Sequence, residues 1–116
     1  MDFTEGVTEQ KSAGFSELLA EENIGKELRT EGMIHSIRDM GEVEFLILRS
    51  REGLFQTVWE KEKTKLPVLP RESMAVRAAG ILRAEERAPH GRELYLTGLQ
   101  VLSEPAGPLP VAVDKW

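Results

Sequence analysis

Residues 31–59 read EGMIHSIRDMGEVEFLILRSREGLFQTVW, and this stretch decides the fold. It contains three apolar runs separated by two polar segments, each of which is closed by a glycine, Gly41 and Gly53. Glycine supplies the permissive backbone that a tight turn between strands requires. The run Leu54–Trp59 alternates between two faces, and Val43–Leu48 is β-rich enough for a strand buried on both faces over part of its length. The stretch therefore predicts three strands joined by two tight turns.

The rest of the chain extends this pattern on both sides. The first strand is expected to begin at about Lys26 and to run to Ile37. A charged connector follows Trp59, and alternating segments predict two more strands at Met74–Arg83 and Glu93–Leu102. Five strands with a connector after the third are typical of an oligonucleotide-binding (OB) barrel, a small closed Greek-key sheet. The predicted fold class is therefore all-β, a five-stranded OB-fold barrel.

The N-terminal region predicts a short helix and a leader. Ser16 is a residue type that caps helices, so the helix is expected to run from Ser16 through Asn23, with Gly25 beyond its end. The polar, aperiodic residues 1–14 are interpreted as a flexible leader. Residues 15–104 then form the OB domain, and the proline-containing residues 105–116 form a hinge or linker.

Composition narrows the classes of function that remain. The chain has 116 residues, a net charge of −5 and no cysteine, so disulfides, thiol catalysis and thiolate zinc sites are excluded. No apolar run approaches the length that spans a bilayer, and no secretion signal is visible, so a cytoplasmic location is expected. The acidic balance predicts weak unaided affinity for RNA. Most arginines nevertheless fall in the middle and late segments, at Arg38, Arg49, Arg51, Arg71, Arg77, Arg83, Arg87 and Arg92.

The central stretch resembles the N-terminal anticodon-binding domain of the aspartyl, asparaginyl and lysyl group of class II aminoacyl-tRNA synthetases. The resemblance covers roughly residues 24–111. The tail resembles the last strand and the leucine-proline hinge of the aspartyl and asparaginyl branches. The matching positions are Gly32-Met33-Ile34, Arg38-Asp39, Gly41, Phe45, Leu48-Arg49, Gly53, Gln56-Thr57-Val58, and in the tail Glu93–Leu96, Leu99–Glu104 and Pro108–Val111.

The resemblance implies roles for Phe45 and Gln56. In this family the aromatic residue at the position of Phe45 stacks on the central anticodon base, and stacking is worth roughly 1–3 kcal/mol per base. The glutamine at the position of Gln56 reads a central uracil through its amide. On composition alone, Phe45 is better explained as a core residue and Gln56 as a solvated polar residue. Their adjacent strands would bring both side chains onto one face, which favours the functional interpretation.

Two further residues are candidates for contacts with nucleic acid. Arg38 offers a planar fork of donors for a phosphate or a base edge, and the alternative is a salt bridge with Asp39 or Glu42. Glu93 matches the acidic residue that the family uses near the first anticodon base. Its alternative is a plain surface charge, and Tyr95 is its rival at this end of the strand.

No catalytic or metal-binding pattern is present in the sequence. The two histidines, His35 and His90, have no partner at metal-ligand spacing, and no phosphate loop or nucleophile elbow occurs. No cofactor is expected. The resemblance implies that the class II catalytic domain is missing, so the chain alone is not expected to activate an amino acid.

The expected partners are the anticodon loop of an aspartate- or asparagine-type tRNA and a synthetase catalytic domain, in cis or in trans. The chain would be either an excised synthetase module or a free-standing relative. Two other functions stay open, a general single-stranded nucleic-acid binder and a protein-interaction module built on the same barrel.

Overall fold

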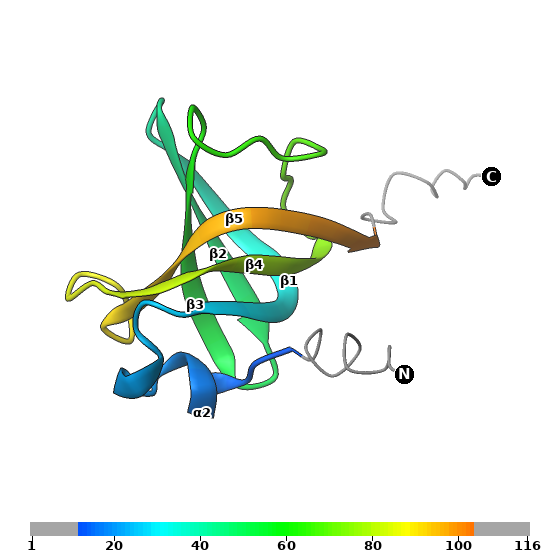
Figure 1. Cartoon of the computed structure of the whole chain (residues 1–116). Coiled ribbons are helices and arrows are strands. Elements are labelled where there is room, and N and C mark those ends of the chain that lie inside the picture. The colour runs from blue at the N-terminus through cyan, green and yellow to red at the C-terminus, as the bar shows by residue number, and fades with distance from the viewer. Residues whose placement is uncertain (1–11, 104–116) are drawn as a thin grey trace, which may run out of the picture.

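The computed structural model describes residues 12–103, which form a closed five-stranded barrel (Figure 1). The strand order around the barrel is β1-β2-β3-β5-β4. The predicted OB-type fold class is confirmed, and the predicted strand boundaries agree to within two residues. The strands are β1 (Glu27–Asp39), β2 (Val43–Ser50), β3 (Gly53–Glu60), β4 (Ala75–Ala84) and β5 (Arg92–Ser103).

The long strand β1 belongs to both halves of the barrel. Its first part, Glu27–Met33, pairs antiparallel with β4, and its second part, Met33–Asp39, pairs antiparallel with β2. A register shift between Ile34 and Ser36 lies in the second part, and such irregularities bend a strand. One strand can therefore hydrogen-bond to two different neighbours and close the sheet on itself.

The barrel closes between β3 and β5, the only parallel pair among the described strands. This closure is short, because only Gln56, Thr57 and Val58 pair with Glu93, Leu94 and Tyr95. It places Gln56 directly beside Glu93, although 37 positions separate these residues in the sequence.

Side chains alternate between a buried interior and a partly exposed outer face. The interior face of β4 carries Met74 just before the strand, then Val76, Ala78, Gly80 and Leu82. Strand β2 differs from the prediction of burial on both faces. Its inward residues Glu44, Leu46 and Leu48 are buried, whereas Val43, Phe45 and Ile47 stay partly exposed. In a single closed sheet one face of each strand points outward, and no other described element covers β2 there.

A close backbone contact explains Gly80. A Cβ atom at Gly80 would lie 2.3 Å from the carbonyl oxygen of Tyr95 on β5. A register shift between Ala79 and Gly80 accompanies this approach. Gly98 on the opposite strand has open space around its Cα. Glycine is therefore required at the first of these positions and not at the second.

The predicted N-terminal helix is present but shorter than expected and capped differently. It consists of α2 (Phe15–Leu18) followed by a separate 3-10 turn, η1 (Glu21–Asn23). The N-cap is Gly14 rather than Ser16, and its N–H donates to Glu17 Oε1 at 2.8 Å. Leu18 is 1% exposed and belongs to the barrel core.

Contacts with the barrel decide where this helix begins. The Phe15 N–H donates to Glu52 Oε1 at 2.9 Å, and the Phe15 ring lies 5.1 Å from the His90 ring and 6.0 Å from the Phe55 ring, measured between centroids. These partners come from distant parts of the chain, so local capping preference does not set the helix start.

Most of the predicted leader and all of the predicted hinge lie outside the described residues. At the inner end of the leader, the Ala13 N–H donates to the Arg29 carbonyl oxygen, and the Thr30 hydroxyl donates to the Ala13 carbonyl oxygen at 3.0 Å. Within residues 12–103, no helix has the length and apolar character needed to cross a membrane.

Candidate nucleic-acid interface

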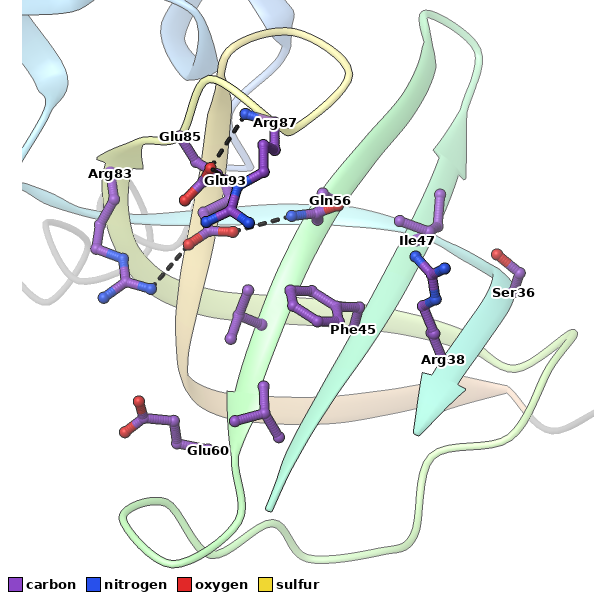
Figure 2. Close-up of a pocket in the computed structure, with 12 residues that line it drawn as sticks. Ser36, Arg38, Phe45, Ile47, Gln56, Glu60, Arg83, Glu85, Arg87 and Glu93 are labelled. Carbon is purple, nitrogen blue, oxygen red and sulfur yellow. Dashed lines mark hydrogen bonds and ion pairs between the residues drawn. The ribbon is translucent and has the colours of Figure 1, made fainter. Parts of the chain in front are cut away.

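A hollow of about 740 Å³ opens on the outer face of the barrel, over β2, β3 and the ends of β1, β4 and β5 (Figure 2). Its apolar surface comes from Val43, Phe45, Ile47 and Val58. Its polar surface includes three arginines and three glutamates, so the formal charges of its lining balance. The polar residues are Ser36, Arg38, Gln56, Glu60, Arg83, Glu85, Arg87 and Glu93.

Phe45 and Gln56 project into this hollow from adjacent strands, as the sequence predicts. Phe45 pairs with Val58 across β2 and β3, and the next outward pair joins Ile47 to Gln56. The two side chains are thus diagonal neighbours on one face. The Phe45 ring is partly exposed and does not belong to the described core, in contrast to Phe55, which is 2% exposed. The alternative of Phe45 as a core residue is therefore wrong.

Gln56 is held by a carboxylate rather than freely solvated. Its Nε2 donates to Glu93 Oε1 at 2.9 Å, and the other carboxylate oxygen, Oε2, accepts from the Arg83 guanidinium at 2.8 Å. Glu93 is only 4% exposed, so the alternative of a plain surface charge is wrong. A buried carboxylate needs such partners, because leaving it unpaired in the interior is costly.

Arg38 lies at the edge of the hollow with its guanidinium exposed (Figure 2). Within residues 12–103 no carboxylate lies at ion-pair distance from Arg38, so the alternative of a salt bridge with Asp39 or Glu42 is wrong there. Asp39 instead accepts from the Gly41 N–H at 2.9 Å and from Lys61 Nζ at 3.0 Å. These two hydrogen bonds, with the Gly41 bond the larger cause, lower the pKa of Asp39 below its ordinary value. Arg38 is left available for an external anion.

Tyr95, the rival of Glu93, does not line the hollow. Its hydroxyl donates to Glu60 Oε1 at 2.8 Å, and this hydrogen bond is the main cause that raises the pKa of Tyr95. The Arg83 guanidinium lies 4.5 Å from the centroid of the Tyr95 ring, a cation–π contact that fixes the arginine beside Glu93.

Reasoning from the sequence missed Arg83, Glu60, Glu85 and Arg87 as members of this site. Arg83 and Glu60 are strand residues. Alternation alone predicts only that they point outward or lie at the end of a strand. The other two lie in the loop between β4 and β5, where Glu85 Oε2 accepts from the Arg87 N–H at 3.0 Å. Only the closure of the barrel brings this loop over β3. The charged, arginine-containing composition of this loop was the one sequence signal that could have pointed to it as part of a nucleic-acid site.

The chemistry of the hollow suits a planar, polar ligand. It combines an exposed aromatic ring, a fixed amide and arginines at the edge, which are the groups that hold unstacked nucleobases and their phosphates. Among residues 12–103 there is no group of three histidine, aspartate or glutamate side chains that could hold a metal ion.

The chain is similar over most of its length to one part of a much longer class of proteins. No family model matches it. It is 38% identical over 96 residues to the aspartate–tRNA(Asp/Asn) ligase of Methanopyrus kandleri, a match that covers 78% of this chain and 22% of that protein. It is 34% identical over 93 residues to the Thermus thermophilus ligase of the same name, covering 80% of this chain and 21% of that protein. The chain thus spans about a fifth of the length of the curated relatives it matches.

Solved structures agree with this similarity. The asparaginyl-tRNA synthetase of Pyrococcus horikoshii complexed with asparaginyl-adenylate superposes with a TM-score of 0.69 at 27% identity, covering 86% of this chain and 24% of that chain. The OBody AM1L10 bound to hen egg-white lysozyme superposes with a TM-score of 0.63 at 20% identity, which supports the fold alone. The match covers 81% of this chain and 96% of that chain.

The resemblance stated from the sequence is confirmed by these comparisons. The matched segment corresponds to the N-terminal region of the synthetases and leaves their catalytic domain without a counterpart in these 116 residues.

Proposed function

We propose, from its homology to the N-terminal anticodon-binding domain of aspartyl- and asparaginyl-tRNA synthetases, that this chain binds the anticodon loop of an aspartate- or asparagine-type tRNA. The central base, a uracil, would stack on Phe45 and hydrogen-bond to Gln56. The observation that carries the proposal is the convergence of these two side chains in one hollow of about 740 Å³. A binding site of this volume accommodates a flipped base and part of its backbone.

The stacking contact is supported by the position of Phe45. Its ring lines the hollow together with Val58 and Ile47 and stays partly exposed. Base–aromatic stacking tolerates any base, so Phe45 would supply affinity without choosing the sequence. Selection then has to come from hydrogen bonds to the base edge, for which Gln56 is the nearest neighbour on the adjacent strand.

The arginines at the edge of the hollow would position the RNA backbone. Arg38 is exposed, and Arg87 has 92% of its side-chain surface exposed, so both can reach a phosphate. The lining carries as many glutamates as arginines, and the whole chain has a net charge of −5. We therefore expect modest affinity for an isolated loop and a synthetase catalytic domain, in cis or in trans, as a second partner. Cytoplasm, where tRNA is charged and used, is the proposed location.

The proposal is tested by replacing Gln56 with leucine and measuring the affinity for anticodon stem-loops by calorimetry. The wild-type chain should prefer a loop with a central uracil over one with a central cytosine and over a scrambled loop. Gln56→Leu should reduce affinity for the uracil loop more than for the cytosine loop, because only hydrogen bonds distinguish these bases. Gln100→Leu is the matched control, since Gln100 lies on β5 outside the hollow and contacts Arg77.

Each alternative function has its own outcome in this experiment. Equal binding of all three loops by the wild-type chain would indicate a general single-strand binder. If the wild-type chain bound none of the three loops, the protein-interaction module would be the remaining function.

A further inference from the structure

Glu93 lies at the centre of a three-residue chain of hydrogen bonds that crosses three strands. Gln56 on β3 is the Cα partner of Glu93 on β5, and Glu93 is in turn the Cα partner of Arg83 on β4. Each carboxylate oxygen takes one of these neighbours, Oε1 the Gln56 amide and Oε2 the Arg83 guanidinium. Figure 2 shows the two contacts on opposite sides of the carboxylate.

This arrangement fixes which end of the Gln56 amide faces the hollow. A carboxylate only accepts hydrogen bonds, so the NH2 group of Gln56 must point at Glu93. Gln56 lines the hollow, and its carbonyl oxygen then lies on the side of the amide that is turned away from Glu93 (Figure 2). Turning the amide over would place its oxygen against the buried carboxylate. That arrangement is repulsive and leaves both oxygens unpaired.

We propose that Glu93, held by Arg83, is a positioning residue that fixes the orientation of the Gln56 amide, so that its carbonyl oxygen is the acceptor offered to the bound base. The proposal rests on the proposed function and explains how the same site chooses its base. Uracil and guanine carry a ring N–H on their pairing edge and can donate it to a fixed acceptor. Cytosine and adenine have an unprotonated ring nitrogen at that position, which would face the Gln56 oxygen without a proton between them, and their donor on this edge is the exocyclic amino group beside it.

A free glutamine would not discriminate in this way. Its amide can rotate to present either a donor or an acceptor, so it can pair with either class of base. The expected discrimination against cytosine is on the order of ten- to a hundredfold, or about 1.4–2.7 kcal/mol, which lies within the cost of leaving a polar group unpaired. Selection of the base therefore depends on Glu93, a buried residue that lies behind Gln56.

The test is Glu93→Gln, measured as the ratio of affinities for stem-loops with central uracil and central cytosine. The Arg83 guanidinium requires an acceptor, so the new amide oxygen should face Arg83 and the new NH2 group should face Gln56. That would turn the Gln56 amide over and present its NH2 group to the base. We expect the preference for uracil to fall at least about tenfold, to parity or into preference for cytosine.

Two control variants test whether the loss of uracil preference in Glu93→Gln comes from the change in charge, or from an action of Glu93 that is independent of Gln56. Glu31→Gln removes a carboxylate from another cross-strand arginine pair, Arg77–Glu31, which lies outside the hollow. It should leave the uracil preference unchanged. In the Gln56→Leu background, Glu93→Gln should cause no further change in the ratio, because Glu93 acts on the choice of the central base only through Gln56.

A spectroscopic readout on the wild-type chain covers the case in which Glu93→Gln does not fold. The side-chain NH2 protons of Gln56 should exchange with water more slowly than those of Gln100, whose hydrogen bond uses only its oxygen. Equal exchange, or an unchanged uracil preference in a folded Glu93→Gln variant, would overturn the positioning role while leaving the proposed function intact. A wild-type chain without uracil preference would overturn both.

Discussion

Replacement of Phe45 by alanine separates the binding role of this ring from a structural one. The ring is partly exposed and lines the hollow, whereas Phe55 on the next strand is 2% exposed and belongs to the core. Loss of a base–aromatic stack should weaken binding of an anticodon stem-loop by about 1–3 kcal/mol, or roughly five- to 150-fold in Kd. The loss should be similar for central uracil and central cytosine, since stacking is insensitive to the base.

The same replacement should cost little stability. The Phe45 ring lacks packing on the side that faces the hollow, so its removal should cost on the order of 1–2 kcal/mol. Phe55→Ala, the matched control, should cost about 3–5 kcal/mol because it leaves a cavity in the core. A domain of this size has roughly 5–15 kcal/mol of stability, so Phe45→Ala should stay folded.

Thermal melts and fluorescence anisotropy with a labelled stem-loop measure the two effects on the same preparations. If Phe45 stacks on a base, Phe45→Ala should show a small shift in Tm and a large loss of affinity. A melt as impaired as that of Phe55→Ala, or unchanged affinity in a folded variant, would refute the stacking role.

Two further predictions concern the barrel itself. Asp39→Asn should lower Tm near neutral pH and should have the same Tm as the wild type in acid. The folded-state pKa of Asp39 lies below its ordinary value of 3.8, so its charged form stabilises the fold above that pH. This stabilisation is lost as pH falls through the folded-state pKa. Melting curves from pH 7 to pH 2 check this, and a difference that persists at the acid end would contradict it. Gly80→Ala should destabilise the barrel by about 1–3 kcal/mol, because the new Cβ would lie 2.3 Å from the Tyr95 carbonyl oxygen, whereas Gly98→Ala has open space and should be close to neutral. Denaturant unfolding compares the two variants, and equal midpoints would show that the strands move apart at no cost.

Local pattern in the sequence determined the strands and the turns. These features depend on neighbouring residues, since alternation with a period of two and a glycine in a turn are properties of short segments. The pattern also placed Phe45 and Gln56 on one face, because two strands joined by a tight turn have a register that the turn sets. The resemblance to the synthetase domain added the role of each residue.

Tertiary structure alone decided what surrounds these two residues. The parallel closure of β3 on β5 has no turn to set its register, so the pairing of Gln56 with Glu93 is not readable from either strand. The burial of Glu93, its second partner Arg83 and the position of the loop between β4 and β5 all follow from that closure. The helix start at Gly14 likewise depends on Glu52 and His90, which lie far along the chain. Short-range pattern thus identified the residue expected to read the base. Long-range pairing decided which atom of that residue is turned toward Glu93 and which is turned away, because the orientation of an amide is set by its hydrogen-bond partners and not by its neighbours in sequence.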